Sequence, residues 1–407
     1  MPSPQNFVII GASLAGSKAA ETLRSEGFDR RIILLGEEPV RPYEHPPLSK
    51  GYLGGEDDFD SAAVHPADFC SSNDIELRTS TAVTVIDPTV SEIELSGGER
   101  LRYNRLLIAT GASPKRLSIA GSELAGIHYL RNVADADALR QVINTAIPVV
   151  VIGAGWIGAE VAASARQLGA EVALVELESV PLKRVLGEEV GKIYRDLHAE
   201  REVKLHFGVG IESIRGTNKA EEVILSNGTT IATGVVVVGV GVAPRTELAQ
   251  VAGLALDNGI VAEEYLASSV PGIFAAGDVA NVLHPAYGQG IPLEHWSAAL
   301  DQGPVAAKNM LGQNVAYHKV PFFYSDQYEL GMGYRGWAPS FDEVVLQGDV
   351  TRRELIAFWM HHGKVAAAMN ANIWDQGDSI EALISAGRLI DTGRLVDSDI
   401  DLANLVS

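Results

Sequence analysis

Cysteine is almost absent from this chain of 407 residues, which contains only Cys70. A lone thiol cannot form a disulfide within the chain, so the sequence indicates a reducing compartment. The same scarcity excludes catalysis by a pair of cysteines that cycles between dithiol and disulfide. Any redox chemistry must therefore depend on other groups.

Long apolar runs and an excess of positive charge are also missing. The longest apolar runs, such as residues 235–242, are far shorter than the ~20 residues that a membrane helix needs. No positive stretch precedes an apolar run at the N-terminus. The formal net charge of −20 disfavours nucleic acid and anionic membranes as partners, because both would be repelled. We expect a soluble, cytoplasmic protein without a signal peptide.

Hydrophobic residues make up 46% of the chain, and its 407 residues exceed the ~250–300 that one core supports. Short apolar runs that end at or near glycine alternate with amphipathic stretches in two similar units. The runs lie at 7–11 and 31–37 around a helical pattern at 14–24, and at 149–153 and 171–176 around 157–168. Consecutive apolar positions are typical of parallel strands covered on both faces, so we predict an α/β fold.

The first unit carries a glycine-rich turn, Gly11-Ala-Ser-Leu-Ala-Gly16, between its predicted strand and helix. This is the context of a dinucleotide-binding fingerprint, in which the helix N-terminus faces a pyrophosphate. Ser13 stands where a second glycine is usual, and Glu37 after the next strand is suited to bind a ribose hydroxyl. A glycine-rich turn without a ligand is the alternative for this degenerate pattern.

The second unit carries the complete pattern, Gly153-Ala-Gly155-Trp-Ile-Gly158. Glu176 follows about 20 residues later, as the fingerprint requires. A carboxylate there accepts hydrogen bonds from ribose hydroxyls and repels a 2′-phosphate, so we predict NADH rather than NADPH. The predicted strand, the predicted helix and the acidic residue all match the fingerprint. This favours dinucleotide binding over glycines that serve only a structural purpose.

The pattern changes after Pro321. Hairpin-like strands are predicted at 343–348, 354–361 and 365–368, and a helix at 379–385. This order is typical of a small α+β module rather than of a third parallel sheet.

Further motifs follow one order along the chain: Arg41-Pro-Tyr-Glu-His-Pro-Pro-Leu-Ser-Lys50, Ala109-Thr-Gly-Ala-Ser-Pro114, Leu130-Arg-Asn-Val, Gly277-Asp278 and Tyr324-Ser-Asp-Gln327. With the two fingerprints, they make nearly the whole chain resemble the ferredoxin reductase components of bacterial oxygenase systems. The resemblance implies two Rossmann-like domains of the glutathione-reductase type and a small C-terminal α+β domain. It implies an FAD-binding domain at 1–114 and 247–320, an NADH-binding domain at 115–246 and the C-terminal domain at 321–407.

The resemblance also implies which residues bind FAD and NAD. FAD would occupy the first fold, with Asp278 at its ribityl chain, and NADH would occupy 153–160 with Glu176. The full set of expected cofactor contacts is Gly11, Ser13, Ala15, Gly16, Glu37, Arg41, Lys50, Val83, Ala109, Thr110, Gly111, Arg131, Gly153, Gly155, Trp156, Ile157, Gly158, Glu160, Glu176, Gly241, Asp278, Glu294, Trp296 and Tyr324.

Lys50 and Glu160 are the expected catalytic residues. A cation beside the flavin N5 atom stabilises the negative charge of reduced flavin, and Glu160 on the second fingerprint helix is suited to hold the ammonium there. The alternative is a solvated surface lysine. Trp156, also in the fingerprint, either covers the flavin and swings aside for nicotinamide or packs against the neighbouring domain.

The leading functional hypothesis is therefore NADH:ferredoxin reductase activity. FAD takes two electrons from NADH and passes them singly to a 2Fe–2S ferredoxin that feeds an oxygenase. Relatives that work through a cysteine place it after the first ribose acid, where this chain has Pro-Pro-Leu-Ser-Lys50. The alternatives are reduction of rubredoxin or a small acceptor, and an NADH-sensing flavoprotein of the apoptosis-inducing-factor type.

An acidic ferredoxin and this acidic chain would repel each other, so docking requires a local basic patch. The candidates are Lys115, Arg116, Arg335, Arg352 and Arg353, with ordinary solvated charges as the alternative. We expect no metal site, because the pair His361-His362 lacks carboxylate or cysteine partners at ligand spacing.

Overall fold

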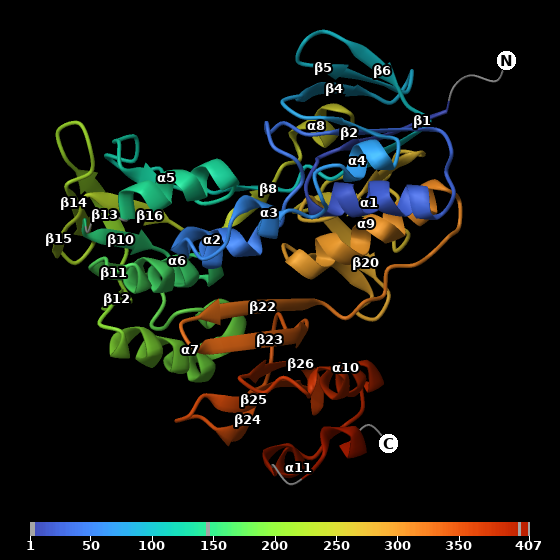
Figure 1. Cartoon of the computed structure of the whole chain (residues 1–407). Coiled ribbons are helices and arrows are strands. Elements are labelled where there is room, and N and C mark those ends of the chain that lie inside the picture. Colours follow the sequence, from blue (N-terminus) through green and yellow to red (C-terminus); the bar gives the residue numbers. More distant parts are fainter. Residues whose placement is uncertain (1–4, 144–146, 398–399, 406–407) are drawn as a thin grey trace. The chain divides into compact units, whose positions relative to one another are not determined.

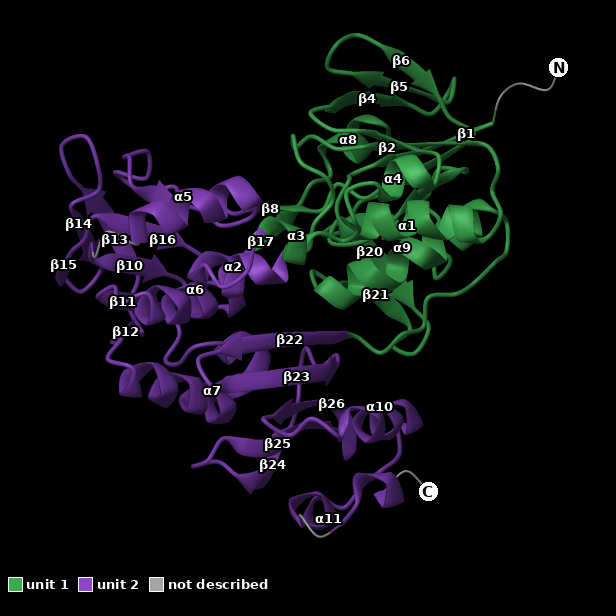
Figure 2. Cartoon of the chain, viewed as in Figure 1, with its two compact units in different colours: residues 1–44, 59–113, 242–321 green, residues 45–58, 114–241, 322–407 purple. Residues whose placement is uncertain are grey.

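The computed structural model describes residues 5–143, 147–397 and 400–405 (Figure 1). The chain forms two compact units, each built from segments that are distant in the sequence (Figure 2). Unit 1 contains residues 1–44, 59–113 and 242–321, and unit 2 contains residues 45–58, 114–241 and 322–407.

A five-stranded parallel sheet forms the centre of unit 1. Its strands follow the order β19 (Ile273–Ala275), β7 (Arg105–Ile108), β1 (Asn6–Ile10), β2 (Arg31–Leu35) and β3 (Ile75–Arg78). Almost every residue of β1, β2 and β7 is buried, which confirms the predicted parallel strands.

Helices α1 (Leu14–Ser25) and α9 (Trp296–Met310) pack against each other in unit 1. The predicted apolar face of α1, including Leu14, Ala19 and Leu23, is buried. The two helices cross closely at Gly303, because a Cβ atom there would lie 2.3 Å from the Ala15 carbonyl oxygen. Unit 1 also contains α3 (Phe59–Ala62), α4 (Phe69–Ser72), α8 (Glu247–Val251), the sheet of β4 (Val83–Asp87), β5 (Glu92–Leu95) and β6 (Arg100–Arg102), and the sheet of β18 (Ile260–Ala262), β20 (Ala280–His284) and β21 (Gln289–Pro292). Its strand β17 (Val242–Pro244) pairs with β8 (Ala112–Pro114).

Unit 2 contains a second five-stranded parallel sheet. Its order is β12 (Lys204–Phe207), β11 (Val172–Glu176), β10 (Val149–Ile152), β16 (Val235–Val238) and β9 (Ile127–His128). The other elements of this half are α5 (Val133–Ile143), α6 (Trp156–Gln167), α7 (Lys183–Glu200) and the antiparallel sheet of β13 (Ile211–Arg215), β14 (Glu222–Leu225) and β15 (Thr230–Ala232). The predicted repeat of strand, glycine turn, helix and strand is thus present in both units.

The C-terminal part of unit 2 is an antiparallel sheet with helices, as the α+β pattern predicts. Its strand order is β22 (Phe322–Gln327), β23 (Leu330–Gly336), β26 (Lys364–Ala371), β25 (Glu354–His361) and β24 (Glu343–Asp349). The helices are α10 (Gly377–Ala386), α11 (Thr392–Val396) and the 3₁₀ helix η2 (Leu402–Leu405).

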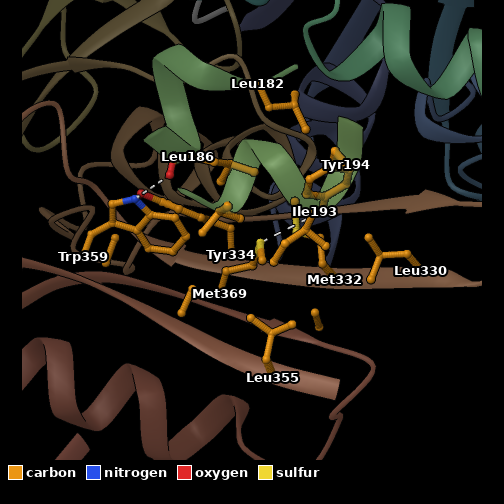
Figure 3. Close-up of a cluster of buried hydrophobic side chains, with 14 of the residues drawn as sticks. Leu182, Leu186, Ile193, Tyr194, Leu330, Met332, Tyr334, Leu355, Trp359 and Met369 are labelled. Carbon is orange, nitrogen blue, oxygen red and sulfur yellow. Dashed lines mark hydrogen bonds between the residues drawn. The ribbon is translucent and has the colours of Figure 1, made fainter. Parts of the chain in front are cut away.

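This C-terminal sheet shares a hydrophobic core with helix α7 of the second fold (Figure 3). Leu186, Val190, Tyr194 and Leu197 lie three or four residues apart on α7, so they share one buried face. The indole Nε1 of Trp359 on β25 donates a hydrogen bond to the Leu186 carbonyl oxygen over 3.2 Å. The common core explains why residues 114–241 and 322–407 form one unit, whereas the three-domain division stays a prediction.

Candidate functional site

Six predicted contacts follow four neighbouring parallel strands of unit 1. Gly11 comes directly after β1, residues 109–111 follow β7, Glu37 follows β2 and Asp278 follows β19. The register pairs Ile10 at the end of β1 with both Leu35 and Ile108. Because parallel strands end at the same edge, the fold brings these residues to one edge of the sheet, where dinucleotides bind in open α/β folds.

The glycine turn of unit 1 is closely packed at its first and last positions. Gly11 has a φ of +115°, and a Cβ atom there would lie 2.0 Å from the Ala109 carbonyl oxygen. A Cβ atom at Gly16 would lie 2.0 Å from the Gly11 carbonyl oxygen. Ser13 precedes α1 with an extended backbone, and its side chain does not cap the helix. The first N–H groups of α1 are therefore not satisfied by Ser13, as an anion-binding turn requires.

Glu37 has a partner that the sequence did not reveal. Its carboxylate forms an ion pair with Arg245 over 2.8 Å, and its side chain is 57% exposed. The hydroxyl of Thr110 donates a hydrogen bond to the Arg245 carbonyl oxygen over 2.9 Å, which ties this segment to the 109–111 turn. Arg245 lies outside every motif, so no spacing signal could have identified it.

Two further contacts orient the end of the α9 segment. The amide Oε1 of Gln302 accepts a hydrogen bond from the Gly277 N–H over 2.8 Å, next to Asp278. The indole Nε1 of Trp296 donates to the Glu44 carboxylate over 2.8 Å. Glu294 is exposed. Neither Gln302 nor Glu44 was predicted as a site residue. Gln302 nevertheless positions the backbone beside Asp278, and Glu44 positions Trp296, and both of these were predicted contacts.

The other predicted FAD contacts fall into both units. Arg41 forms an ion pair with Asp60 over 2.6 Å and lies over the Phe59 ring, and Val83 begins β4, all within unit 1. Arg131, Lys50 and Tyr324 belong to unit 2. Burial, reinforced by the charge of Arg131, holds the pKa of His45 well below its usual range.

The second glycine turn, in unit 2, has the same packing with one difference. Gly153 has a φ of +96°, and its Cβ atom would lie 2.4 Å from the Gly239 carbonyl oxygen. A Cβ atom at Gly158 would lie 1.9 Å from the Gly153 carbonyl oxygen. At Gly155, by contrast, a Cβ atom would meet no atom of the described residues within 4 Å apart from those next to it in the chain. Protein packing does not explain this middle glycine, whereas close approach of a dinucleotide does.

Glu176 lies beside this second turn as the last residue of β11. Its carboxylate accepts hydrogen bonds from the backbone N–H groups of Ala154, over 2.6 Å, and Glu178, over 3.1 Å. Gly241 follows β16 with a φ of +101°, and Ile157 in the first turn of α6 is 43% exposed. The predicted NADH contacts therefore surround one edge of the sheet.

Lys50 and Glu160 form a partly buried ion pair within unit 2. The Lys50 Nζ lies 3.0 Å from the Glu160 Oε1, and the two side chains are 17% and 4% exposed. The Lys50 ammonium also lies 5.2 Å from the centre of the Tyr324 ring. Lys50 follows the 3₁₀ helix η1 (Pro46–Ser49), and α2 (Gly51–Gly54) comes after it. The geometry does not fit the alternative of a freely solvated lysine.

Two serine hydroxyls complete the surroundings of Glu160. Ser49 donates to the Glu160 Oε2 over 2.5 Å, and Ser325 donates to the Oε1 over 2.7 Å. A buried carboxylate without hydrogen-bond donors would be strongly disfavoured, and here Lys50, Ser49 and Ser325 supply these donors. The motifs containing both serines were recognised in the sequence, but their contact with Glu160 was not.

Trp156 packs against aromatic residues of its own unit. Its ring meets Phe323 edge to face, with centroids 4.9 Å apart, and Tyr194 with centroids 6.2 Å apart. The tryptophan thus packs against aromatic side chains of unit 2, and its role as a movable cover of the flavin stays a prediction.

Cys70 lies on α4, away from the segment that follows Glu37. Burial raises the pKa of this thiol, which disfavours the reactive thiolate. Within residues 5–143, 147–397 and 400–405, no group of three or more metal-binding side chains is arranged around a common point. In the same ranges, every helix is too short or too polar to cross a membrane.

Two glycine-turn edges, each with an acidic residue beside it, define an oxidoreductase of the two-dinucleotide-fold class. The pyridine nucleotide-disulphide oxidoreductase family matches residues 5–303, and the reductase C-terminal family matches residues 322–406. The chain belongs to the pyridine nucleotide-disulphide oxidoreductase family, with a reductase C-terminal domain.

Among curated proteins, the chain is 38% identical to rhodocoxin reductase of Rhodococcus erythropolis, over 85% of this chain and 81% of that protein. It is 36% identical to the ferredoxin–NAD(+) reductase component of the anthranilate 1,2-dioxygenase system of Burkholderia cepacia, over 98% and 99%. The solved covalent complex of putidaredoxin reductase with putidaredoxin matches with a TM-score of 0.95 and 32% identity, over 99% of this chain and 98% of that chain. These matches confirm the expected resemblance to ferredoxin reductases and the expected fold.

Proposed function

We propose that the protein is an FAD-dependent NADH:ferredoxin reductase that supplies an oxygenase with electrons. The observation that carries this proposal is the pair of glycine-turn edges, combined with the buried Lys50–Glu160 pair where cysteine-dependent relatives carry a thiol. The relatives named for ferredoxin reduction span nearly the whole chain. We assign the reaction to the cytoplasm, where NADH is available.

Unit 1 would hold FAD and unit 2 would hold NADH. When bound, FAD would accept a hydride from NADH and release electrons one at a time. The turn from Gly11 to Gly16 would bind the pyrophosphate of FAD, Glu37 its ribose and Asp278 its ribityl chain. Residues 109–111 border the same edge of the sheet.

In unit 2, the turn from Gly153 to Gly158 would bind the pyrophosphate of NADH. The Glu176 carboxylate is held by two backbone N–H groups, one on each oxygen, and each oxygen keeps a lone pair that could accept a hydrogen bond from a ribose hydroxyl. A 2′-phosphate would be repelled by this charge, which supports the preference for NADH. Lys50 would stabilise the negative charge of the reduced flavin, and Glu160 would position Lys50.

The structure changes which basic residues are available for ferredoxin docking. The Arg353 side chain is 14% exposed and forms ion pairs with Glu200 and Glu329. Arg335 lies over the Phe322 ring, and burial lowers its pKa. Lys115, Arg116 and Arg352 are exposed, although Arg352 pairs with Glu354 over 3.2 Å and Arg116 lies over the Tyr129 ring. Because their charges remain accessible, we propose these three as the cations that attract an acidic ferredoxin.

The test is NADH-dependent reduction of purified 2Fe–2S ferredoxins, followed by the loss of ferredoxin absorbance and by coupled cytochrome c reduction. We expect a yellow protein with non-covalent FAD, rapid turnover and a higher kcat/KM with NADH than with NADPH. A long-lived complex with NADH and slow electron release would instead indicate a sensor. Protein purified gently without flavin absorbance would contradict the proposal.

Cys70→Ser tests whether the thiol takes part in this reaction. Because burial raises the pKa of the thiol and so disfavours the thiolate, we expect ferredoxin-dependent turnover within about twofold of the wild type, less than ~0.4 kcal/mol. A large fall in turnover with FAD still bound would restore a thiol mechanism.

A further inference from the structure

In the Ser-Asp-Gln motif on β22, only Ser325 has so far been connected with the site, as a donor to Glu160. Ser325 and Gln327 are two residues apart on the strand, so they share one face, and both are buried. Asp326 between them is exposed. Strand β22 packs against α6, the helix that carries Glu160. The buried face of the motif is therefore directed toward the Lys50–Glu160 pair.

A chain of hydrogen bonds starts at Glu160 and continues through this motif to α7. The Ser325 hydroxyl donates to the Glu160 Oε1 over 2.7 Å. The Gln327 Nε2 donates to the Ser325 Oγ over 3.4 Å, and the Gln327 Oε1 lies 3.0 Å from the His198 Nε2. The Tyr328 hydroxyl lies 3.5 Å from the His198 Nδ1. Ser325, Gln327 and His198 are all buried.

The chemistry of the groups determines the direction of every bond in this chain. The ionised Glu160 carboxylate only accepts, so Ser325 must donate to it. The Gln327 Oε1 also only accepts, so the proton of the His198 ring lies on Nε2 and its Nδ1 accepts from Tyr328. Burial, partly opposed by the bond to Gln327, lowers the pKa of His198 to about 4, so the ring is neutral. All four donors are thus oriented toward Glu160.

We propose that Ser325, Gln327 and His198 are positioning residues that hold the Glu160 carboxylate, and through it the Lys50 ammonium. The inference rests on the proposed role of Lys50 in NADH oxidation. Hydrogen bonds that all point the same way polarise one another, so the chain strengthens the bond that reaches Glu160. It also gives the C-terminal sheet a direct part in the reaction, because two of the three residues lie on β22.

The first experiment removes the one member of this chain of hydrogen bonds that contacts Glu160 directly. Ser325→Ala should lower kcat for NADH oxidation with ferricyanide by about three- to tenfold, the usual worth of one hydrogen bond, while KM for NADH stays within about twofold. The midpoint potential of bound FAD should shift in the same direction as in Lys50→Met, but less. Ser325→Thr keeps the hydroxyl and should restore the wild-type potential.

A matched control separates positioning from general loss of packing. Thr233 is buried in the same unit, and its hydroxyl donates to the Pro148 carbonyl oxygen over 3.0 Å, outside the chain. Thr233→Val therefore removes a buried hydroxyl of the same kind without touching Glu160. It should lower the thermal unfolding temperature as Ser325→Ala does, but leave the flavin potential and kcat unchanged.

The second experiment is a double-mutant cycle between Ser325 and His198. His198→Phe should shift the flavin potential less than Ser325→Ala, because it lies further along the chain. The double variant should match Ser325→Ala alone, since His198 acts only through Ser325. Additive shifts, or a potential that moves equally in Thr233→Val, would overturn the positioning role.

The variant Lys50→Met shows whether a negative result disproves only the positioning chain or also the proposed role of Lys50. If Lys50→Met leaves both potential and rate unchanged, the role of Lys50 is wrong and the inference is overturned with it. If Lys50→Met changes both while Ser325→Ala and His198→Phe do not, only the positioning chain is wrong.

Discussion

The two glycine turns share one backbone design but hold their acidic residue differently. In unit 2, two backbone N–H groups hold the Glu176 carboxylate, and one of them belongs to Ala154 inside the glycine turn. In unit 1, Glu37 is more than half exposed, and its partner is the Arg245 side chain. The acid of unit 2 is therefore fixed by the fold, whereas the acid of unit 1 depends on an exposed ion pair that contributes little.

The two turns also differ at their middle position, where unit 2 has Gly155 and unit 1 has Ser13. Gly155 leaves open space at the second turn, whereas Ser13 occupies that position in the first, with its hydroxyl 3.5 Å from the Tyr43 carbonyl oxygen. A site that binds and releases NADH in each cycle needs close, exact contacts. A site that retains its flavin has additional contacts along a longer cofactor and tolerates a less regular turn.

The largest effect is expected from breaking the packed glycine of the second turn. Gly153→Ala would place a Cβ atom 2.4 Å from the Gly239 carbonyl oxygen, at a φ that side chains rarely adopt. We expect a loss of about 3 kcal/mol or more in the free energy of unfolding, or failure to fold. The thermal unfolding temperature measures this loss of stability. Gly155→Ala is the control, and it should unfold at the temperature of the wild type. Equal unfolding temperatures for the two variants would contradict this assignment.

Acid sensitivity is the next largest effect, and it compares one histidine from each unit, His198 and His295, whose pKa values are both lowered. Burial lowers the pKa of His198 in unit 2 to about 4, and burial lowers that of His295 in unit 1 to about 4 as well. In the unfolded chain each histidine binds a proton as the pH falls below about 6.5. In the folded protein the same histidine stays neutral until the pH approaches 4. Stability therefore falls as the pH drops through this window, by about 3 kcal/mol for His198.

His198→Phe should remove the part of this acid-induced loss of stability that comes from unit 2, and should leave the part that comes from His295 in unit 1. The measurement is the difference in thermal unfolding temperature between pH 7 and pH 5, which should be smaller in His198→Phe than in the wild type. Thr233→Val, which has no titratable group, serves as the control and should keep the wild-type difference. An unchanged difference in His198→Phe would mean that this histidine is protonated in the folded protein.

Loss of each acid compares the two turns directly. Glu176→Ala should lower kcat/KM for NADH by about 10- to 100-fold, because a charged acceptor for ribose hydroxyls is lost, and should narrow the preference over NADPH. Glu37→Ala should weaken FAD binding by no more than about fivefold, because its side chain is exposed. Steady-state kinetics and flavin release measure the two effects. A larger effect at Glu37 would reverse the comparison.

Much of this architecture could be predicted from the sequence, because its signals are local. The strand at Phe7, the helix face of Leu23 and both glycine turns depend on residues within about 20 positions of one another. The ion pair of Lys50 and Glu160 is also present in the structure as predicted. It could be predicted because both residues lie in recognised motifs, although 110 positions separate them. Arg245 and Ser325 were missed as site residues because each reaches its partner across more than 150 positions of the chain, and no periodicity records such a contact. Gln302 lies 25 positions from Gly277 but outside every motif, so no pattern pointed to it.

The smallest effects are expected from exchanging the middle residues of the two turns. Gly155→Ser places a side chain where no atom of the described residues lies within 4 Å apart from those next to it in the chain, so the fold should be unaffected, but the side chain meets an approaching dinucleotide. We expect KM for NADH to rise about threefold, the cost of one displaced backbone contact. Ser13→Gly removes a side chain that caps no helix, and an N-cap serine replaced by glycine costs only a few tenths of a kcal/mol. FAD affinity should therefore stay within about twofold, measured by flavin release. If Ser13→Gly instead released FAD readily, the Ser13 hydroxyl would be a phosphate ligand, and the first turn would depend on its side chain as much as the second depends on lacking one.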